Sequence, residues 1–295
     1  MIAPSLDLAT FLATKKPILM EGAMGTELAK RSADMGGRST LTHPEQVLAI
    51  HRDYVGCGCR MLITNTLTMN RIFLDGHKDI DLREVNLTGA RLARQAVGPE
   101  RYVLGDISST GKLLKPYGQL TEEVALTAFA EQAALLAEGG VDGFLIETMM
   151  DLKEALCALR ACQSVSTLPV IVSMAFKTPK NGGRTMMGDT AKDCAQALTE
   201  AGACVIGANC GDIDPLQTAE VVAMLHAETA LPILAKPNAG KPRLVDGKVI
   251  YDMPITAFLA GMTACLEAGA ILVGGCCGTA PDYIQALADA IRPDE

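Results

Sequence analysis

The sequence of 295 residues is poor in several features, and each absence excludes a class of protein. No stretch approaches the ~20 consecutive apolar residues of a membrane-spanning helix, and the first residues do not show the pattern of an export signal. Lysine and arginine form no run and the net charge is -8, which argues against nucleic acid or an anionic membrane as a partner. Proline and serine do not cluster into a linker. We therefore expect a cytoplasmic protein with one domain over residues 1–295.

Apolar residues are abundant, at 49% of the chain, and they gather in eight short runs separated by segments of helical length. The runs are residues 18–20, 61–64, 102–104, 143–146, 170–174, 204–207, 233–235 and 271–274. Strands that are apolar throughout are typical of a parallel sheet covered on both faces. Eight strand–helix units predict an α/β protein with a (β/α)₈ (TIM) barrel.

The segments between the runs carry helix signals. Residues 122–138 and 191–201 have apolar and polar residues at helical spacing, and glycines such as Gly202 and Gly269 stand where a left-handed helix cap would fall. Residues 1–16 form a lead-in, with a short helix over 5–14 that Ser5 caps. We expect loops at 68–82 and 178–190, and a hairpin at 241–252 with Asp246-Gly247 at its turn.

Polar residues follow the predicted strands directly. In such a barrel the carboxyl ends of all strands meet at one rim, which holds the active site. Glu21 and Glu147 each close an apolar run, and a buried carboxylate costs several kcal/mol unless a partner compensates it. Each could cap a helix or pair with arginine, but together they could also hold a cation such as an α-ammonium group. Asp106 occupies a similar position.

Three of the ten cysteines also follow predicted strands and are flanked by glycine, namely Cys210, Cys276 and Cys277. Three thiols with no fourth protein ligand describe an open zinc site, in which the fourth position is left for a substrate. Zinc is preferred because it is a borderline-soft ion that binds thiolates in tetrahedral geometry. The alternatives are buried thiols or a strained disulfide between neighbours. Asn209 could orient the site from beside Cys210.

The remaining cysteines and the four histidines carry no comparable signal. Seven cysteines fall in helices, at helix ends or at a strand start, which are Cys57, Cys59, Cys157, Cys162, Cys194, Cys204 and Cys265. Cys57-Gly58-Cys59 resembles part of a metal-binding motif, but it precedes its strand and should lie at the opposite rim. The histidines show no paired metal spacing, so we expect them at the surface or in helix packing.

At these positions the sequence resembles the zinc-dependent homocysteine S-methyltransferase family. The shared motifs are residues 21–26, 65–66, 147–148, 209–210, 237–240 and 274–279. Within that family the chain most resembles the homocysteine-binding barrel of cobalamin-dependent methionine synthases, notably at residues 105–107 and at Gly278.

The resemblance implies roles for the residues above. Cys210, Cys276 and Cys277 would be the zinc ligands and would also be catalytic, because the metal activates the thiol of L-homocysteine. Glu21 and Glu147 would hold the homocysteine amine. Gly22, Ala23, Asp106 and Asn209 complete the expected substrate site. One departure is Glu21, since the family usually has aspartate at that position.

The resemblance also bears on the methyl donor. The chain has no tryptophan, and an aromatic cage for a trimethylammonium group is therefore not expected. The folate-binding and cobalamin-binding modules of full-length methionine synthases are not seen in these residues, so we expect a methylated corrinoid carried by a partner protein. The alternatives are S-methylmethionine or S-adenosylmethionine as donor, a zinc-dependent transfer to another thiol, and a non-catalytic zinc-holding subunit.

Overall fold

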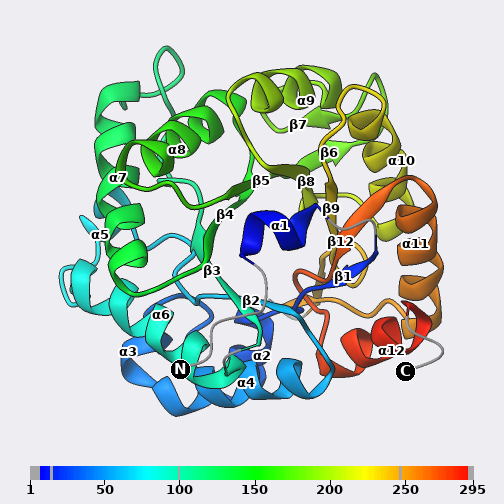
Figure 1. Cartoon of the computed structure of the whole chain (residues 1–295), viewed down its shortest axis with the longest axis horizontal. Helices are drawn as coiled ribbons and strands as arrows, with labels where there is room; N and C mark the ends of the chain where they lie inside the picture. The colour runs from blue at the N-terminus through cyan, green and yellow to red at the C-terminus, as the bar shows by residue number, and fades with distance from the viewer. Residues whose placement is uncertain (1–6, 14–15, 99, 246–247, 292–295) are drawn as a thin grey trace.

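The computed structural model describes residues 7–13, 16–98, 100–245 and 248–291. Eight parallel strands form a nearly closed barrel that alternates with helices (Figure 1). In order of pairing they are β1 (Ile18–Leu19), β12 (Ala270–Val273), β9 (Ile233–Lys236), β8 (Val205–Asn209), β5 (Val170–Met174), β4 (Gly143–Met149), β3 (Tyr102–Ile107) and β2 (Met61–Ile63). A bridge from Met20 to Met61 brings the two edge strands together. The predicted (β/α)₈ barrel and all eight of its strands are confirmed.

Helices surround the barrel (Figure 1). They are α2 (Gly25–Lys30), α3 (Ser39–Thr42), α4 (Pro44–Gly56), α5 (Arg71–Leu74), α6 (Leu82–Val97), α7 (Glu122–Glu138), α8 (Leu152–Val165), α9 (Ala191–Glu200), α10 (Pro215–His226), α11 (Ile255–Glu267) and α12 (Pro281–Ile291). The two helices predicted at 122–138 and 191–201 are confirmed as α7 and α9. Gly202 and Gly269 have φ of 86° and 105°, as expected for left-handed caps. No helix in the described ranges is both long and apolar enough to cross a membrane.

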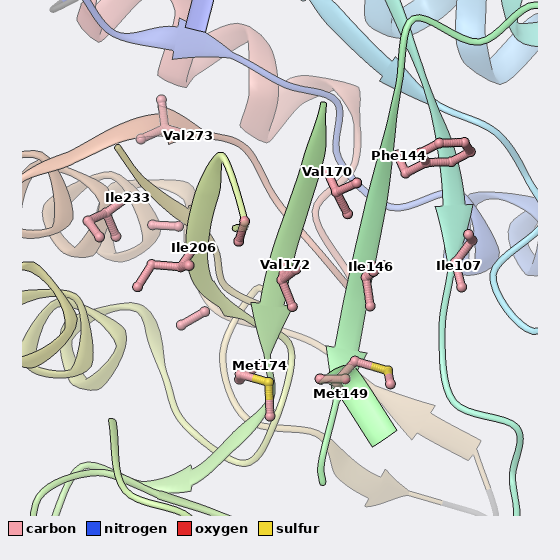
Figure 2. Packing of buried hydrophobic residues seen from close by; sticks show 14 of the residues in the cluster. Ile107, Phe144, Ile146, Met149, Val170, Val172, Met174, Ile206, Ile233 and Val273 are labelled. Atoms are coloured by element: carbon pink, nitrogen blue, oxygen red, sulfur yellow. The ribbon is translucent and has the colours of Figure 1, made fainter. Parts of the chain in front are cut away.

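Residues along each strand alternate between two cores, because successive side chains of a strand point to opposite faces. Phe144 and Ile146 of β4 pack in the core between strands and helices, part of which Figure 2 shows. Leu145 lies between them in sequence but belongs to a separate cluster inside the barrel, together with Leu104 and Leu234 of other strands. The strands are thus apolar on both faces, which explains their uninterrupted runs in the sequence.

Helix α1 (Leu8–Leu12) lies over the middle of the ring in Figure 1 and covers one end of the barrel. Leu8 and Leu12 join the interior cluster of the barrel, and the ring of Phe11 stacks on Tyr102 with centroids 4.7 Å apart. The helix is shorter than expected. Its cap is Asp7, whose carboxylate accepts the N–H of Thr10, while the predicted cap Ser5 lies outside the described residues.

Two of the three predicted rim segments contain more structure than expected. Residues 68–82 contain α5. Residues 178–190 contain β7 (Arg184–Thr185), which forms an antiparallel pair with β6 (Phe176–Thr178). The hairpin predicted at 241–252 is confirmed by the antiparallel pairing of β10 (Arg243–Val245) with β11 (Lys248–Ile250). Its predicted turn, Asp246-Gly247, lies outside the described residues.

Candidate metal centre and the adjoining pocket

Three cysteine sulfurs converge at the carboxyl ends of the strands. The Sγ atoms of Cys210, Cys276 and Cys277 all lie within 4.8 Å of one another. A tetrahedral zinc ion about 2.3 Å from each sulfur would set the sulfurs about 3.8 Å apart, which is compatible with this upper limit on their separations. The chemistry and spacing of these donors therefore fit a metal that prefers thiolates.

The segment after β9 holds the backbone of all three cysteines. The N–H of Cys210 donates to the carbonyl of Lys236 at 3.2 Å, and the N–H of Cys276 donates to the carbonyl of Pro237 at 2.9 Å. The N–H of Cys277 donates to Oδ1 of Asn238 at 3.0 Å. Two segments that are far apart in sequence are thus fixed to one short strand end, and this arrangement brings the thiols together.

Glycine allows the cysteine loop to pack this closely. A Cβ on Gly275 would lie 2.1 Å from Oγ1 of Thr279, and a Cβ on Gly22 would lie 2.3 Å from the carbonyl oxygen of Thr279. Gly278 has φ of 81°, which other residues rarely adopt. The loop of residues 274–279 consequently sits against the segment after β1, so that Gly22 and Ala23 lie beside the cysteines.

Two residues that are not glycine adopt left-handed backbone angles beside the thiols. Thr148 has φ of 59° and Cys210 has φ of 54°. Such strain persists only where neighbouring contacts impose it, and it is common at functional sites. For Thr148 the buried side chain of Asn209 supplies such contacts, because its Oδ1 accepts the N–H of Thr148 at 2.8 Å and its Nδ2 donates to the Thr148 hydroxyl at 2.8 Å. Nδ2 also lies 3.8 Å from Sγ of Cys276.

The three thiols are hydrogen-bonded to one another, and these bonds shift their pKa values in different directions. Hydrogen bonds from Cys210 and Cys276 lower the pKa of Cys277 to about 3. The pKa of Cys276 rises to about 12, because the hydrogen bond from Cys210 is outweighed by its own bond to Cys277 and by burial. Hydrogen bonding to the other two sulfurs raises the pKa of Cys210 as well. The cluster favours a single thiolate, and binding a metal would release the other protons.

A polar layer lies inside the barrel at the cysteine end. On each contributing strand these residues follow an interior apolar position by an even number, two on β3, β4, β5 and β9 and four on β8, so they also point inward. All are buried, and they are Asp106, Glu147, Ser173, Asn209 and Lys236. Three of them were candidate site residues in the sequence, whereas Ser173 and Lys236 were missed.

Lys236 forms an ion pair with Glu147 inside this layer. Its Nζ lies 2.8 Å from Oε2 of Glu147, and the lysine side chain is 2% exposed. Burial alone would lower the pKa of Lys236, but the charges of Glu147 and Cys276 more than offset burial and raise it. The lysine is therefore charged, and Glu147 has an internal partner that the sequence analysis did not foresee.

The other two candidate carboxylates differ in their partners. Oε1 of Glu21 accepts the N–H of Ile63 at 3.1 Å, and Oε2 lies 3.2 Å from Nδ1 of His51. His51 is fully buried on α4, as the expectation of helix packing allowed, but its contact with Glu21 was not foreseen. Oδ1 of Asp106 is buried without a hydrogen-bond partner among the described residues. Burial, followed by the charge of Glu147, raises the pKa of Asp106 well above its usual value.

A cavity of about 250 Å³ opens beside the thiols. Its lining brings together every candidate site residue except Asn209, which supports it from behind, and it adds Lys236. A second cavity of about 270 Å³ is also lined by Cys210, together with Phe176, Met186 and Tyr251 among others. Cys210 thus borders both cavities.

Comparison with known proteins identifies the family. A model of the homocysteine S-methyltransferase family matches residues 18–291. The chain belongs to this family. The family resemblance found in the sequence is confirmed.

Relatives within the family include two methionine synthases. The protein of Mycobacterium leprae is 30% identical over 309 residues, and that of Mycobacterium tuberculosis is 29% identical over 304 residues. These matches cover 97% and 94% of this chain but 25% of each relative. The chain thus spans about a quarter of the length of these relatives.

Solved structures of family members share the fold. The homocysteine methyltransferase MmuM of Escherichia coli in its metallated form superposes with a TM-score of 0.77 at 21% identity, covering 94% of this chain and 97% of that chain. Its oxidized form gives a TM-score of 0.78 at 20% identity over 96% and 98% of the two chains. At these identities the likeness establishes the barrel alone.

Proposed function

We propose that this chain transfers a methyl group to the thiol of L-homocysteine and so forms methionine, with a zinc ion held by Cys210, Cys276 and Cys277. The observation that carries the proposal is the convergence of these three sulfurs on one wall of a cavity that contains buried carboxylates. A structural zinc site has no need of such a cavity, which disfavours a non-catalytic subunit.

The residues of the pocket would have different roles in the proposed reaction. A bound zinc ion would act as a Lewis acid that favours the nucleophilic thiolate of the acceptor. The carboxyl groups of Glu21, Asp106 and Glu147 line the pocket and supply hydrogen-bond acceptors for the α-ammonium group of an amino acid. Asn209 fixes the position of Cys276, and the buried floor of the barrel excludes water from the reacting atoms. Transfer would form a carbon–sulfur bond while the bond between the methyl group and its donor breaks; the donor keeps that bonding electron pair, and the thiol proton leaves to solvent.

The proposed donor is a methylated corrinoid carried outside these 295 residues. Support comes from the methionine synthase relatives and from the second cavity, which also reaches Cys210. A cytoplasmic location remains a prediction, in keeping with the thiol form of Cys210, Cys276 and Cys277 in the structure.

A donor panel tests the proposal. Zinc-loaded protein is assayed for methionine formation from homocysteine with methylcobalamin, S-methylmethionine or S-adenosylmethionine, and homocysteine binding is measured by calorimetry. We expect turnover with methylcobalamin. Turnover with a sulfonium donor alone would overturn the corrinoid assignment, and absence of homocysteine binding would overturn the acceptor.

A further inference from the structure

A tyrosine on helix α4 contacts both of the segments that meet beside the thiols. Tyr54 is fully buried and packs in the core between strands and helices. Its hydroxyl lies 2.8 Å from the carbonyl oxygen of Ala23 and 3.0 Å from that of Thr279. A phenol has one proton to donate, so the two carbonyl oxygens share it. Phenylalanine would fill nearly the same volume without burying a hydroxyl, so packing alone does not account for tyrosine here.

The two segments follow the first and the last strand of the barrel. Strand β1 has two residues and pairs with β12 at two positions, so few strand bonds close the barrel here. Beyond the strands, the N–H of Gly275 donates to the carbonyl of Glu21 at 3.2 Å, and the N–H of Ala23 donates to the carbonyl of Thr279 at 2.9 Å. Tyr54 reaches the same Thr279 oxygen from α4, which lies outside the barrel beside α2 (Figure 1). The helix thus ties the two segments together where the short strand ends.

Gly22 leaves room for this arrangement. A Cβ at residue 22 would lie 2.9 Å from the hydroxyl oxygen of Tyr54 and 2.3 Å from the carbonyl oxygen of Thr279. Both distances are shorter than ordinary van der Waals contact, so a side chain at residue 22 would push the three groups apart. The close approach of the two segments and the hydroxyl therefore depends on glycine at this position.

Thr279 connects the tyrosine to a metal-ligand candidate. The N–H and the hydroxyl of Thr279 both donate to the carbonyl of Cys276, at 3.1 Å and 2.5 Å. Thr279 is itself fully buried. Hydrogen bonds therefore run from Tyr54 through Thr279 to the backbone of Cys276. Groups that hold metal ligands in place from outside can change the affinity for the metal without touching it.

We propose that Tyr54 is a positioning residue of the metal centre: its hydroxyl holds Thr279 against Ala23 and so fixes the loop that presents Cys276 and Cys277. Without this hydrogen bond the loop would sample more arrangements, and metal binding would have to order it at a cost in affinity. The inference rests on the proposed function, because it takes these thiols to bind zinc. It extends that function to a helix outside the barrel.

Tyr54→Phe removes the hydroxyl and keeps the ring. The dissociation constant for zinc is measured on the full chain by competition with a chromophoric chelator, and we expect binding about threefold to tenfold weaker than in the wild type. Cobalt(II) is then bound in place of zinc, because its visible absorption reports the geometry of its ligands. We expect the absorption bands of Tyr54→Phe to be shifted or weakened. Urea unfolding of the metal-free proteins measures the cost to the fold separately.

A matched control is Tyr283→Phe. It removes a hydroxyl of α12 that also donates to a backbone carbonyl, that of Met253. Zinc affinity and the cobalt spectrum should both stay as in the wild type, even if the variant is less stable to urea. A loss of zinc affinity of equal size in both variants would show that any missing tyrosine hydroxyl has this effect, and would contradict a specific role for Tyr54.

Thr279→Val tests the next hydrogen bond of the series. It removes the hydroxyl that donates to Cys276 and keeps nearly the same shape, so it should also weaken zinc binding. Because both substitutions act through one loop, the loss in Tyr54→Phe/Thr279→Val should be smaller than the product of the two single losses. Losses that multiply would mean that the two residues act independently, which would contradict the inference.

The same measurements separate the inference from the proposed function. If Tyr54→Phe keeps the zinc affinity and cobalt spectrum of the wild type, Tyr54 is structural and the proposed function stands. If Tyr54→Phe does not fold, unchanged zinc affinity in Thr279→Val overturns the inference instead. If the wild type itself binds no zinc, the proposed function fails and the inference fails with it.

Discussion

The molecule has two glycine-flanked cysteine pairs, at opposite ends of the barrel. Cys57 and Cys59 precede β2, and their thiols donate to separate backbone carbonyls, those of Asp53 and Pro281 for Cys57 and that of Met20 for Cys59. Cys276 and Cys277 follow β12, and their sulfurs meet a third thiol. The spacing of a pair in sequence does not make a metal site. The end of the strand at which the pair lies decides whether other ligands meet it.

The same contrast holds for the barrel interior. The amino end is filled by apolar side chains, including Leu145, Leu234 and those of α1. The carboxyl end carries the polar layer with its unpartnered Asp106 oxygen. One end stabilises the fold, whereas the other accepts buried charge for the sake of binding. Substitutions at the two ends should therefore have different consequences.

The largest expected difference is between Cys276→Ser and Cys59→Ser. Serine at 276 removes one of three thiolate donors, so methyl transfer should fall below about a thousandth of the wild-type rate, a loss of roughly 4 kcal/mol in transition-state stabilisation. Serine at 59 can still donate to the Met20 carbonyl and should retain activity, with a stability cost of about 1 kcal/mol. Steady-state methionine formation and urea unfolding check both. Similar activity losses in the two variants would erase the distinction between the pairs.

A second test concerns the support of the metal centre. Asn209→Ala removes the amide that lies 3.8 Å from Cys276 Sγ and braces Thr148. Groups that orient metal ligands in this way affect metal affinity by about tenfold to a hundredfold, and we expect a loss of that size in competition with a zinc chelator. Ser173→Ala, which removes only a 2.7 Å hydrogen bond to Asn209, should have a smaller effect. An Asn209→Ala protein with unchanged zinc affinity would contradict this role.

A smaller effect is expected from Asp106→Asn. Because the pKa of Asp106 is raised in the folded protein, the stability it contributes is present below its unfolded pKa and is lost as pH rises through the folded pKa. Asparagine cannot ionise, so the stability advantage of the variant should grow with pH and reach about 1 kcal/mol or more near neutrality. Urea unfolding between pH 5 and 8 measures the trend.

Glu138→Gln serves as the control for that trend. Glu138 is exposed and its pKa is lowered, first by the hydrogen bond from Arg83, so its contribution is lost as pH falls. That loss occurs below the usual pKa of a glutamate, so the stability difference between Glu138→Gln and the wild type should stay constant between pH 5 and 8, whereas that of Asp106→Asn should grow with pH. A difference between Asp106→Asn and the wild type that does not change with pH would argue against a buried, ionising Asp106.

The sequence predicted the features that depend on local pattern. Eight apolar runs between helical segments define the barrel, and strand ends at one rim bring distant residues such as Cys210 and Cys276 together. Glu21 and Glu147 were predicted as site residues by the same reasoning, because a carboxylate at the end of a buried strand is costly unless a partner compensates its charge.

What the sequence analysis missed depends on alternation and on long-range contacts. Treating each strand as an apolar run ended β9 at Ala235, whereas counting by two from Leu234 places Lys236 inside the barrel. His51 gave no signal, because its partner Glu21 lies 30 residues away. The backbone bonds from the cysteines to residues 236–238 join segments whose proximity follows only from the closed barrel.

The most direct test of the account is the zinc content of the full chain, purified without chelators and measured by elemental analysis. We predict close to one zinc per chain for the wild type and for Cys59→Ser, and almost none for Cys210→Ser, Cys276→Ser or Cys277→Ser. A wild-type protein that binds no zinc on reconstitution, or a Cys276→Ser protein that retains a full equivalent, would contradict the central claim that these three thiols form the metal centre.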